Sequence, residues 1–161
     1  LNIMAHGFAK RGLFLCAGIN EHGTHTKDMT RMGGLFKKMP VTAVCYLICA
    51  LSIAGIPPMM GFFSKYFVIN GLVEGGHPVI ATLAILTAVV TLLYMLKSFH
   101  VVFLGQPRGE SHREGSPVMV GVVAVLAVLT IASGFLLQLP YNLAKVADGQ
   151  RLADVVSLLW R

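Results

Sequence analysis

The stretch Ile53-Ala54-Gly55-Ile56-Pro57-Pro58-Met59-Met60-Gly61-Phe62-Phe63-Ser64-Lys65 decides the fold, because it places two prolines and a lysine inside an apolar run. Pro57 and Pro58 lack a backbone N–H, so they block a helix and deprive carbonyl groups about one turn earlier of their partners. At membrane depth such backbone is tolerated only where it is buried in protein or lines a wet cavity. An intramembrane lysine marks a functional site. The stretch therefore predicts a broken membrane helix on an ion or proton path, with Gly55 and Gly61 beside the break.

The composition predicts an all-α integral membrane protein embedded in the lipid bilayer. The 161 residues are 55% hydrophobic and only 12% charged, whereas a soluble domain carries about 25% charged residues. The mean hydropathy of +0.73 excludes a soluble enzyme. The net charge of +6 does not indicate a nucleic-acid partner, because the basic residues lie between apolar runs.

The sequence contains no motif that would bind a redox cofactor or a metal. Cys16, Cys45 and Cys49 lie in apolar segments without Cys-x-x-Cys spacing, so we expect small buried hydrophobic side chains. His22 and His25 lack further ligands at metal spacing, and a solvated loop is favoured over a metal site. We therefore predict no cofactor, no metal and no redox active site, and a chain that moves ions rather than electrons.

Four apolar segments are predicted to cross the membrane, at residues 1–18, 41–73, 79–104 and 117–139. The second is too long for one straight span of about 20 residues, and the break at the prolines divides it into two half-helices. Pro40 is suited to the start of this segment. Residues 1–140 form the predicted transmembrane domain, and residues 141–161 show the pattern of an amphipathic helix.

The distribution of basic residues predicts the orientation in the membrane. Loop 19–39 carries Lys27, Arg31, Lys37 and Lys38, and loop 106–116 carries Arg108 and Arg113, whereas the turn at residues 70–78 has no Lys or Arg. Basic loops are retained in the cytoplasm. If all four segments span, both basic loops lie on the cytoplasmic side of a bacterial or archaeal cytoplasmic membrane.

A stripe of polar side chains on the first segment predicts a proton relay. Asn2, His6 and Lys10 follow at spacings of four residues, which places them on one face of a helix. Histidine titrates near neutral pH, and desolvation brings lysine closer to that range. The alternative is that Lys10 and Arg11 form the cytoplasmic end of a short span.

Two other sites have simpler alternatives. Lys65 could reach the interface from the end of its half-helix, but eight apolar or weakly polar residues follow it, so we favour an internal position. For Lys97 and His100 we favour the interface, because the third segment ends within about one turn of them.

Three motifs together resemble the antiporter-like subunits of respiratory complex I, which also occur in membrane-bound hydrogenases and Mrp-type cation/proton antiporters. They cover residues 2 to about 70: His6-Gly7-Phe8-Ala9-Lys10 with Leu13-Phe14-Leu15-Cys16-Ala17-Gly18, Met32-Gly33-Gly34-Leu35 with Lys38-Met39-Pro40, and Ala54-Gly55-Ile56-Pro57-Pro58 with Gly61-Phe62-Phe63-Ser64-Lys65.

The resemblance implies a role for individual residues. Lys10 falls on the family's protonatable lysine, His6 on its helper histidine, and Lys65 on the terminal lysine of the broken helix. Asn2 stands where some members carry another histidine, so a relay step there would use water or be absent. Arg11 departs from the family pattern by adding a second charge beside Lys10.

The resemblance also implies partners and a function. Family members contain two inverted repeats of five helices, and this chain matches only the C-terminal part, so we expect the remainder from a missing N-terminal part or a separate chain. The expected function is proton translocation beside other membrane subunits, within a complex I-like oxidoreductase or hydrogenase. The alternatives are Na+/H+ antiport in an Mrp-type complex and a structural membrane anchor without its own ion path.

Overall fold

The computed structural model describes residues 2–29, 31–106 and 115–136, and every regular element in these ranges is a helix. The prediction of an all-α protein is therefore confirmed. The five longer helices are α1 (Asn2–Thr24), α2 (Pro40–Ala54), α3 (Met60–Glu74), α4 (Pro78–Phe99) and α5 (Pro117–Phe135). Two short elements accompany them, the 3₁₀-helix η1 (Leu35–Lys37) and the π-helix η2 (His100–Leu104), which continues α4.

The broken helix lies where the sequence predicts it. Gly55 adopts the left-handed conformation (φ 89°) and ends α2; its N–H donates to the carbonyl of Ser52, and that of Ile56 to the carbonyl of Leu51. This pattern is a Schellman motif, which favours glycine at the left-handed position. Pro57 and Pro58 then form the link to α3. Each half-helix has 15 residues, or about 22 Å, and is shorter than a full membrane span.

The first helix is longer than predicted. We expected it to end at Gly18, but α1 continues to Thr24. Ile19 and Asn20 are buried rather than in a solvated loop, and Gly115 packs against the Ile19 side chain. The hydroxyl of Thr24 donates to the carbonyl of Asn20 at 2.7 Å. Tertiary packing thus extends the helix past a local stop signal.

The later helices begin where the sequence predicts. The predicted turn before the third segment is present, because Gly76 is left-handed (φ 76°) and the N–H of His77 donates to the carbonyl of Leu72. Helix α5 begins at Pro117 as predicted but ends at Phe135, before the predicted Leu139. The predicted amphipathic helix at residues 141–161 lies outside the described residues.

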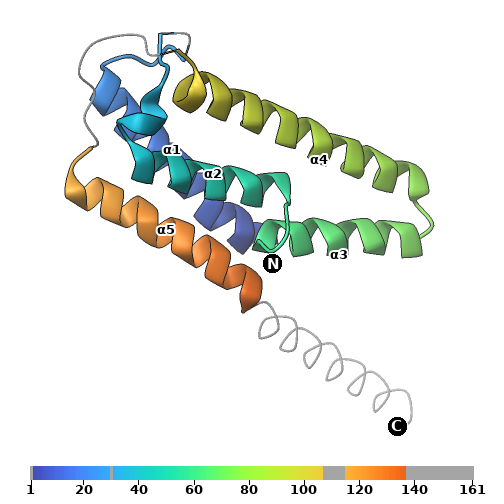
Figure 1. Cartoon of the computed structure of the whole chain (residues 1–161). Coiled ribbons are helices and arrows are strands. Elements are labelled where there is room, and N and C mark those ends of the chain that lie inside the picture. Colours follow the sequence, from blue (N-terminus) through green and yellow to red (C-terminus); the bar gives the residue numbers. More distant parts are fainter. Residues whose placement is uncertain (1, 30, 107–114, 137–161) are drawn as a thin grey trace.

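Helices α1, α2 and α5 share one hydrophobic core (Figure 1). Its buried members come from all three helices: Ala9, Cys16, Ile19, Cys45, Cys49, Ile53, Val123 and Ala127. The three cysteines are buried and free, which confirms their predicted role as small hydrophobic residues. A second cluster joins η1, α2 and the end of α4, where the Tyr46 ring packs on Phe99 and Phe103.

The structure places the first basic loop at the same end of the helix bundle as Gln106 and Gly115, the described residues at the two ends of the second. A Cβ at Gly33, in the first loop, would overlap the carbonyl oxygen of Gln106 at the start of the second, and Gly115 at its end packs on Ile19. The turn between α3 and α4 lies at the opposite end (Figure 1). The described ends of the two loops thus lie together, and their placement on the cytoplasmic side stays a prediction.

Within the described ranges, two helical segments are long and apolar enough to cross a membrane, Pro78–Leu104 and Pro117–Phe135, and α2 is a shorter apolar helix. Most of the α4 surface is exposed, including a continuous set of large apolar side chains: Val79, Ile80, Leu83, Ile85, Leu86, Val89, Val90, Leu93, Tyr94 and Leu96. Such a surface is suited to lipid or to neighbouring membrane helices.

Candidate functional site

Lys65 occupies the helix break. It lies in the second turn of α3, and its Nζ donates a hydrogen bond to the carbonyl oxygen of Ala54 at 2.9 Å. In a continuous helix that carbonyl would bond the N–H of residue 58, which Pro58 does not have. The expectation that carbonyls before the prolines lose their backbone partners therefore applies to Ala54, and the lysine takes the place of the missing donor. The carbonyl end of α2 also carries the negative pole of its dipole, which favours a cation.

Three glycines allow the chain to pack closely around the break. A Cβ at Gly55 would lie 2.9 Å from Cδ of Lys65, so the lysine stem passes directly over this glycine. A Cβ at Gly61 would overlap the carbonyl oxygen of Ser52, and one at Gly134 of α5 would overlap that of Pro58. The predicted glycines and one from α5 therefore bring α2, α3 and α5 into contact at the site.

Half-buried Lys65 also borders an apolar cavity of about 270 Å³ between α3 and α4. Its walls include Ile56, Phe62, Tyr66, Ile85 and Val89. The ammonium group therefore has one polar partner, at the end of α2, and a mainly apolar surrounding on its other side.

His6 links the first helix to the break. Helix α1 packs against α3, and His6 interacts electrostatically with both Lys10 and Lys65. The side chain is half-buried, and its Nδ1 atom is buried without a hydrogen-bond partner among the described residues. The structure thus places a titratable imidazole in range of both predicted relay lysines.

Lys10 lies one turn further along α1 and is exposed in this chain. It borders a cavity of about 410 Å³ together with His6 and Arg11, so the second charge does face the same space. Lys10 also borders a larger cavity of about 540 Å³ between α1, α2 and α4. Asn2 begins α1, and its side chain lies outside the described part of the structure.

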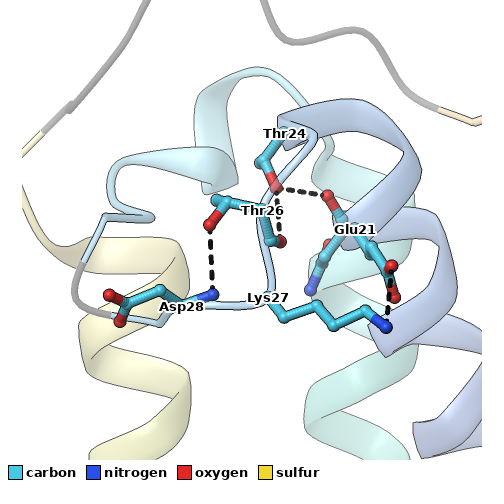
Figure 2. A network of polar contacts seen from close by, with 6 residues as sticks. Glu21, Thr24, Thr26, Lys27 and Asp28 are labelled. Carbon is cyan, nitrogen blue, oxygen red and sulfur yellow. Dashed lines mark hydrogen bonds and ion pairs between the residues drawn. The ribbon is translucent and has the colours of Figure 1, made fainter.

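The remaining titratable candidates lie away from the break. Lys97 and His100 are exposed near the end of α4. His22 lies in the last turn of α1, not in a loop as predicted, and His25 follows with a left-handed backbone (φ 54°). Figure 2 shows the polar contacts at the end of α1 and in the loop after it, where Lys27 pairs with Glu21 at 3.4 Å and the N–H of Asp28 donates to the Thr26 hydroxyl.

The sequence did not reveal two polar features of the bundle interior. Asn20 is buried on α1, in a stretch that we assigned to a loop. The hydroxyl groups of Tyr46 on α2 and Ser98 on α4 share a hydrogen bond of 2.7 Å. Their separation of 52 residues leaves no local pattern from which the contact could be predicted.

With this geometry in place, comparison with known proteins identifies the family. The family described as "NADH:quinone oxidoreductase/Mrp antiporter, TM" matches residues 1–91, more than half of the chain. The chain belongs to this family. As a member with two membrane-capable helices, it is an integral membrane protein.

Relatives of this antiporter-like chain include proteins named as antiporter subunits and as oxidoreductase subunits. It is 36% identical over 135 residues to an Na(+)/H(+) antiporter subunit of Alkalihalophilus pseudofirmus, covering 83% of this chain and 27% of the relative. It is 37% identical over 144 residues to an NADH-quinone oxidoreductase subunit of Mycobacterium tuberculosis, covering 85% of this chain and 23% of the relative. The chain therefore spans about a quarter of the length of these relatives.

Solved structures show the same helix arrangement. The Mrp complex from Dietzia contains a chain that matches with a TM-score of 0.75 at 25% identity, covering 85% of this chain and 34% of that one. The membrane-bound sulfane sulfur reductase, an archaeal respiratory membrane complex, contains another, with a TM-score of 0.76 at 26% identity, covering 81% and 22%. The antiporter-like fold is thus shared with subunits of multisubunit membrane complexes.

Proposed function

We propose that this antiporter-like chain carries protons across the membrane through Lys10, His6 and Lys65, as part of a larger subunit in a multisubunit membrane complex. The observation that supports this proposal most directly is the hydrogen bond from Lys65 to the carbonyl of Ala54 at the helix break. It holds a titratable cation at a position where the backbone has lost its own donor. His6, in electrostatic range of both lysines, is the intermediate station.

The direction of transfer follows from charge repulsion in a poorly solvated site. Two ammonium groups close together in a low dielectric repel each other strongly, so protonation of one favours release from the other. A proton on Lys10 passes through His6, whose neutral imidazole offers one donor and one acceptor nitrogen. Lys65 receives it and releases it toward the side opposite the basic loops. When Lys10 then takes up the next proton, the repulsion between the two ammonium groups favours release from Lys65.

The proposal includes the orientation and the setting of the chain. Four spans place both basic loops in the cytoplasm of a bacterial or archaeal cell and Lys65 on the path to the outer side. Other membrane subunits, and the part of the relatives that this chain does not match, complete the path. The coupling partner is an oxidoreductase or hydrogenase module.

Na+/H+ antiport is the second candidate, because one of the relatives is named as an Na(+)/H(+) antiporter subunit. In vesicles that contain the assembled complex, proton pumping that depends on quinone or hydrogen supports the first candidate. Proton movement that requires a sodium gradient, with matching uptake of radioactive sodium, supports the second.

Substitution of Lys65 tests the relay itself. Lys65→Met keeps the length of the stem and removes the charge, so we expect proton transport into vesicles to fall by about 100-fold, the lower end of what a positioned proton-transfer group contributes. Lys97→Met is the matched control, since Lys97 is an exposed lysine near the end of α4 and should transport normally. Native gel electrophoresis establishes that both variants assemble.

The same experiment separates a relay from a membrane anchor. If Lys65→Met assembles and pumps as well as the parent chain, the relay through this lysine is wrong and the anchor role stands. If Lys65→Met does not assemble, Lys65→Arg replaces it in the test. Arginine retains a donor for the Ala54 carbonyl but does not release its proton. This variant should assemble and fail to pump.

A further inference from the structure

The end of helix α5 packs directly on the helix break. Gly134 of α5 is buried, and a Cβ at this position would overlap the carbonyl oxygen of Pro58 and lie 3.0 Å from the backbone nitrogen of Met60. The next nearest atom, at 3.1 Å, is the carbonyl carbon of Met59. All three atoms belong to the backbone, which cannot rotate aside as a side chain does. Only glycine therefore allows α5 to approach the link between α2 and α3 so closely.

The same helix is attached to α2 one turn before Gly134. The Thr130 side chain is only 1% exposed, and it is hydrogen-bonded to the Cys49 thiol of α2. Val123 and Ala127 of α5 pack into the core that α2 shares with α1. Helix α5 thus contacts both halves of the broken helix, because its body packs on α2 and its end packs on the first residues of α3.

The start of α3 is confined from the side of α2 as well. Gly61 lies so close to α2 that a Cβ there would overlap the carbonyl oxygen of Ser52. The link and the first turn of α3 therefore meet backbone of α2 at Gly61 and backbone of α5 at Gly134. Closely packed interiors transmit strain rather than absorb it. A side chain at position 134 would have to move the start of α3 relative to α2.

Such a movement matters because Lys65 and its partner lie on opposite sides of the break. Lys65 belongs to α3, one turn after Gly61, whereas Ala54, whose carbonyl accepts the lysine's hydrogen bond at 2.9 Å, is the last residue of α2. Hydrogen bonds from nitrogen to oxygen extend to about 3.2 Å, so a shift of α3 by about 0.5 Å is enough to take this bond out of its normal range.

We propose that Gly134 is a positioning residue for Lys65. By admitting the Pro58 carbonyl, it sets the place of α3 against α2 and so keeps the lysine on the Ala54 carbonyl. The inference rests on the proposed function of Lys65, and it adds a residue of α5 that the sequence did not single out. Every contact on which it depends lies in the interior of the described chain.

Gly134→Ala tests the proposal, with Gly121→Ala in the same helix as the matched control. A Cβ at Gly121 meets no atom of the described chain within 4 Å. In vesicles that hold the complete complex, we expect Gly134→Ala to lower proton transport about tenfold, since a 1 Å misplacement at a reacting site costs up to about 100-fold. Gly121→Ala should stay within about twofold of the parent chain.

The pH dependence of transport separates positioning from a general loss of stability. The proton affinity of an ammonium group depends on the acceptor that it bonds. Displacement of Lys65 from the Ala54 carbonyl in Gly134→Ala should therefore move the midpoint of the pH profile by about one unit. A chain that is only destabilised transports less at every pH, with the midpoint unchanged. His6, which α1 places in electrostatic range of Lys65, is the same in both variants.

Thr130→Ala takes over the test if Gly134→Ala does not assemble. It loosens α5 from α2 without adding an atom, and it should also move the midpoint of the pH profile. Thr42→Ala is its control, because Thr42 is an equally buried threonine (1% exposed) at the other end of α2. This variant should lose stability and keep the midpoint of the parent chain.

Two results would overturn the positioning role of Gly134. One is transport by Gly134→Ala at the level of Gly121→Ala, and the other is a loss of transport that leaves the midpoint of the pH profile unchanged. An unchanged midpoint in Thr130→Ala has the same meaning where that variant takes over. Failure of the relay itself is distinguishable, because Lys65→Met would then transport protons normally.

Discussion

The carbonyl oxygen of Ala54 would bond a backbone N–H in a continuous helix, and it bonds the Lys65 ammonium group instead. The difference matters because a backbone N–H always carries its proton. The Lys65 ammonium group can release a proton, and its side chain can then move away from the Ala54 carbonyl. Pro58 removes the permanent donor, and Gly55 leaves the space through which the lysine stem passes. The residues that break the helix are thus also the ones that position the titratable group.

Alanine at Gly55 tests this double role against a matched glycine. Gly55 and Gly76 both end helices with left-handed backbones, but only Gly55 contacts Lys65. Each substitution by alanine should cost about 1–2 kcal/mol from backbone strain and lower the thermal unfolding temperature in detergent. Only Gly55→Ala should also reduce proton transport, since its Cβ displaces the lysine. Equal transport by the two variants would refute a positioning role for Gly55.

At the scale of elements, close helix crossings depend on single small residues. Gly12 of α1 faces α2, and a Cβ there would lie 2.5 Å from Sγ of Cys49 but 3.6 Å from its Cβ. Small residues at such crossings let membrane helices approach closely. The sulfur atom alone therefore limits the size of residue 12 on this side.

A double-mutant cycle tests the crossing of α1 and α2. Gly12→Ala should destabilise the chain by about 1–3 kcal/mol through overpacking. Cys49→Ala removes the sulfur, so the double variant should be more stable than the sum of the two single effects, with a coupling of about 0.5–3 kcal/mol. Thermal unfolding of the four proteins measures this coupling. Strict additivity would show that Gly12 and Cys49 do not meet in the folded chain.

The elements also show what local sequence signals can predict. Pro40, Pro117 and the Gly75–Gly76 turn mark boundaries through backbone chemistry, and the structure confirms them. The prediction that the first helix ends at Gly18 was wrong. Glycine is a common helix stop signal, but packing of Ile19 against residues distant in the sequence extends α1 to Thr24. Burial of Asn20 and the Tyr46–Ser98 bond depend on contacts across helices, which no local pattern encodes.

Over the whole molecule, a three-helix core meets an antiparallel pair of helices at the break. The start of α1, the end of α5 and the junction of α2 with α3 converge there, and α3 and α4 extend beyond the core to the turn at residues 75–78 (Figure 1). The cavity beside Asn20 lies between the helix break and the basic-loop end of the bundle. The apolar cavity beside Lys65 lies between α3 and α4. In the proposed relay, these two cavities would belong to an inner and an outer half of the proton path, with His6 between them.

The orientation of these halves gives the last prediction. Lys37 in η1 and His77 in the turn before α4 are both exposed and lie at opposite ends of the bundle. We expect a membrane-impermeant maleimide to label Lys37→Cys only from the cytoplasmic side and His77→Cys only from the outer side, because basic loops are retained in the cytoplasm. Inside-out and right-side-out vesicles measure the two accessibilities. Labelling of both positions from one side would contradict a membrane crossing by the broken helix α2–α3, which lies between them in the chain. The reverse pattern would mean that the basic loops lie outside and that the path from Lys65 opens to the cytoplasm.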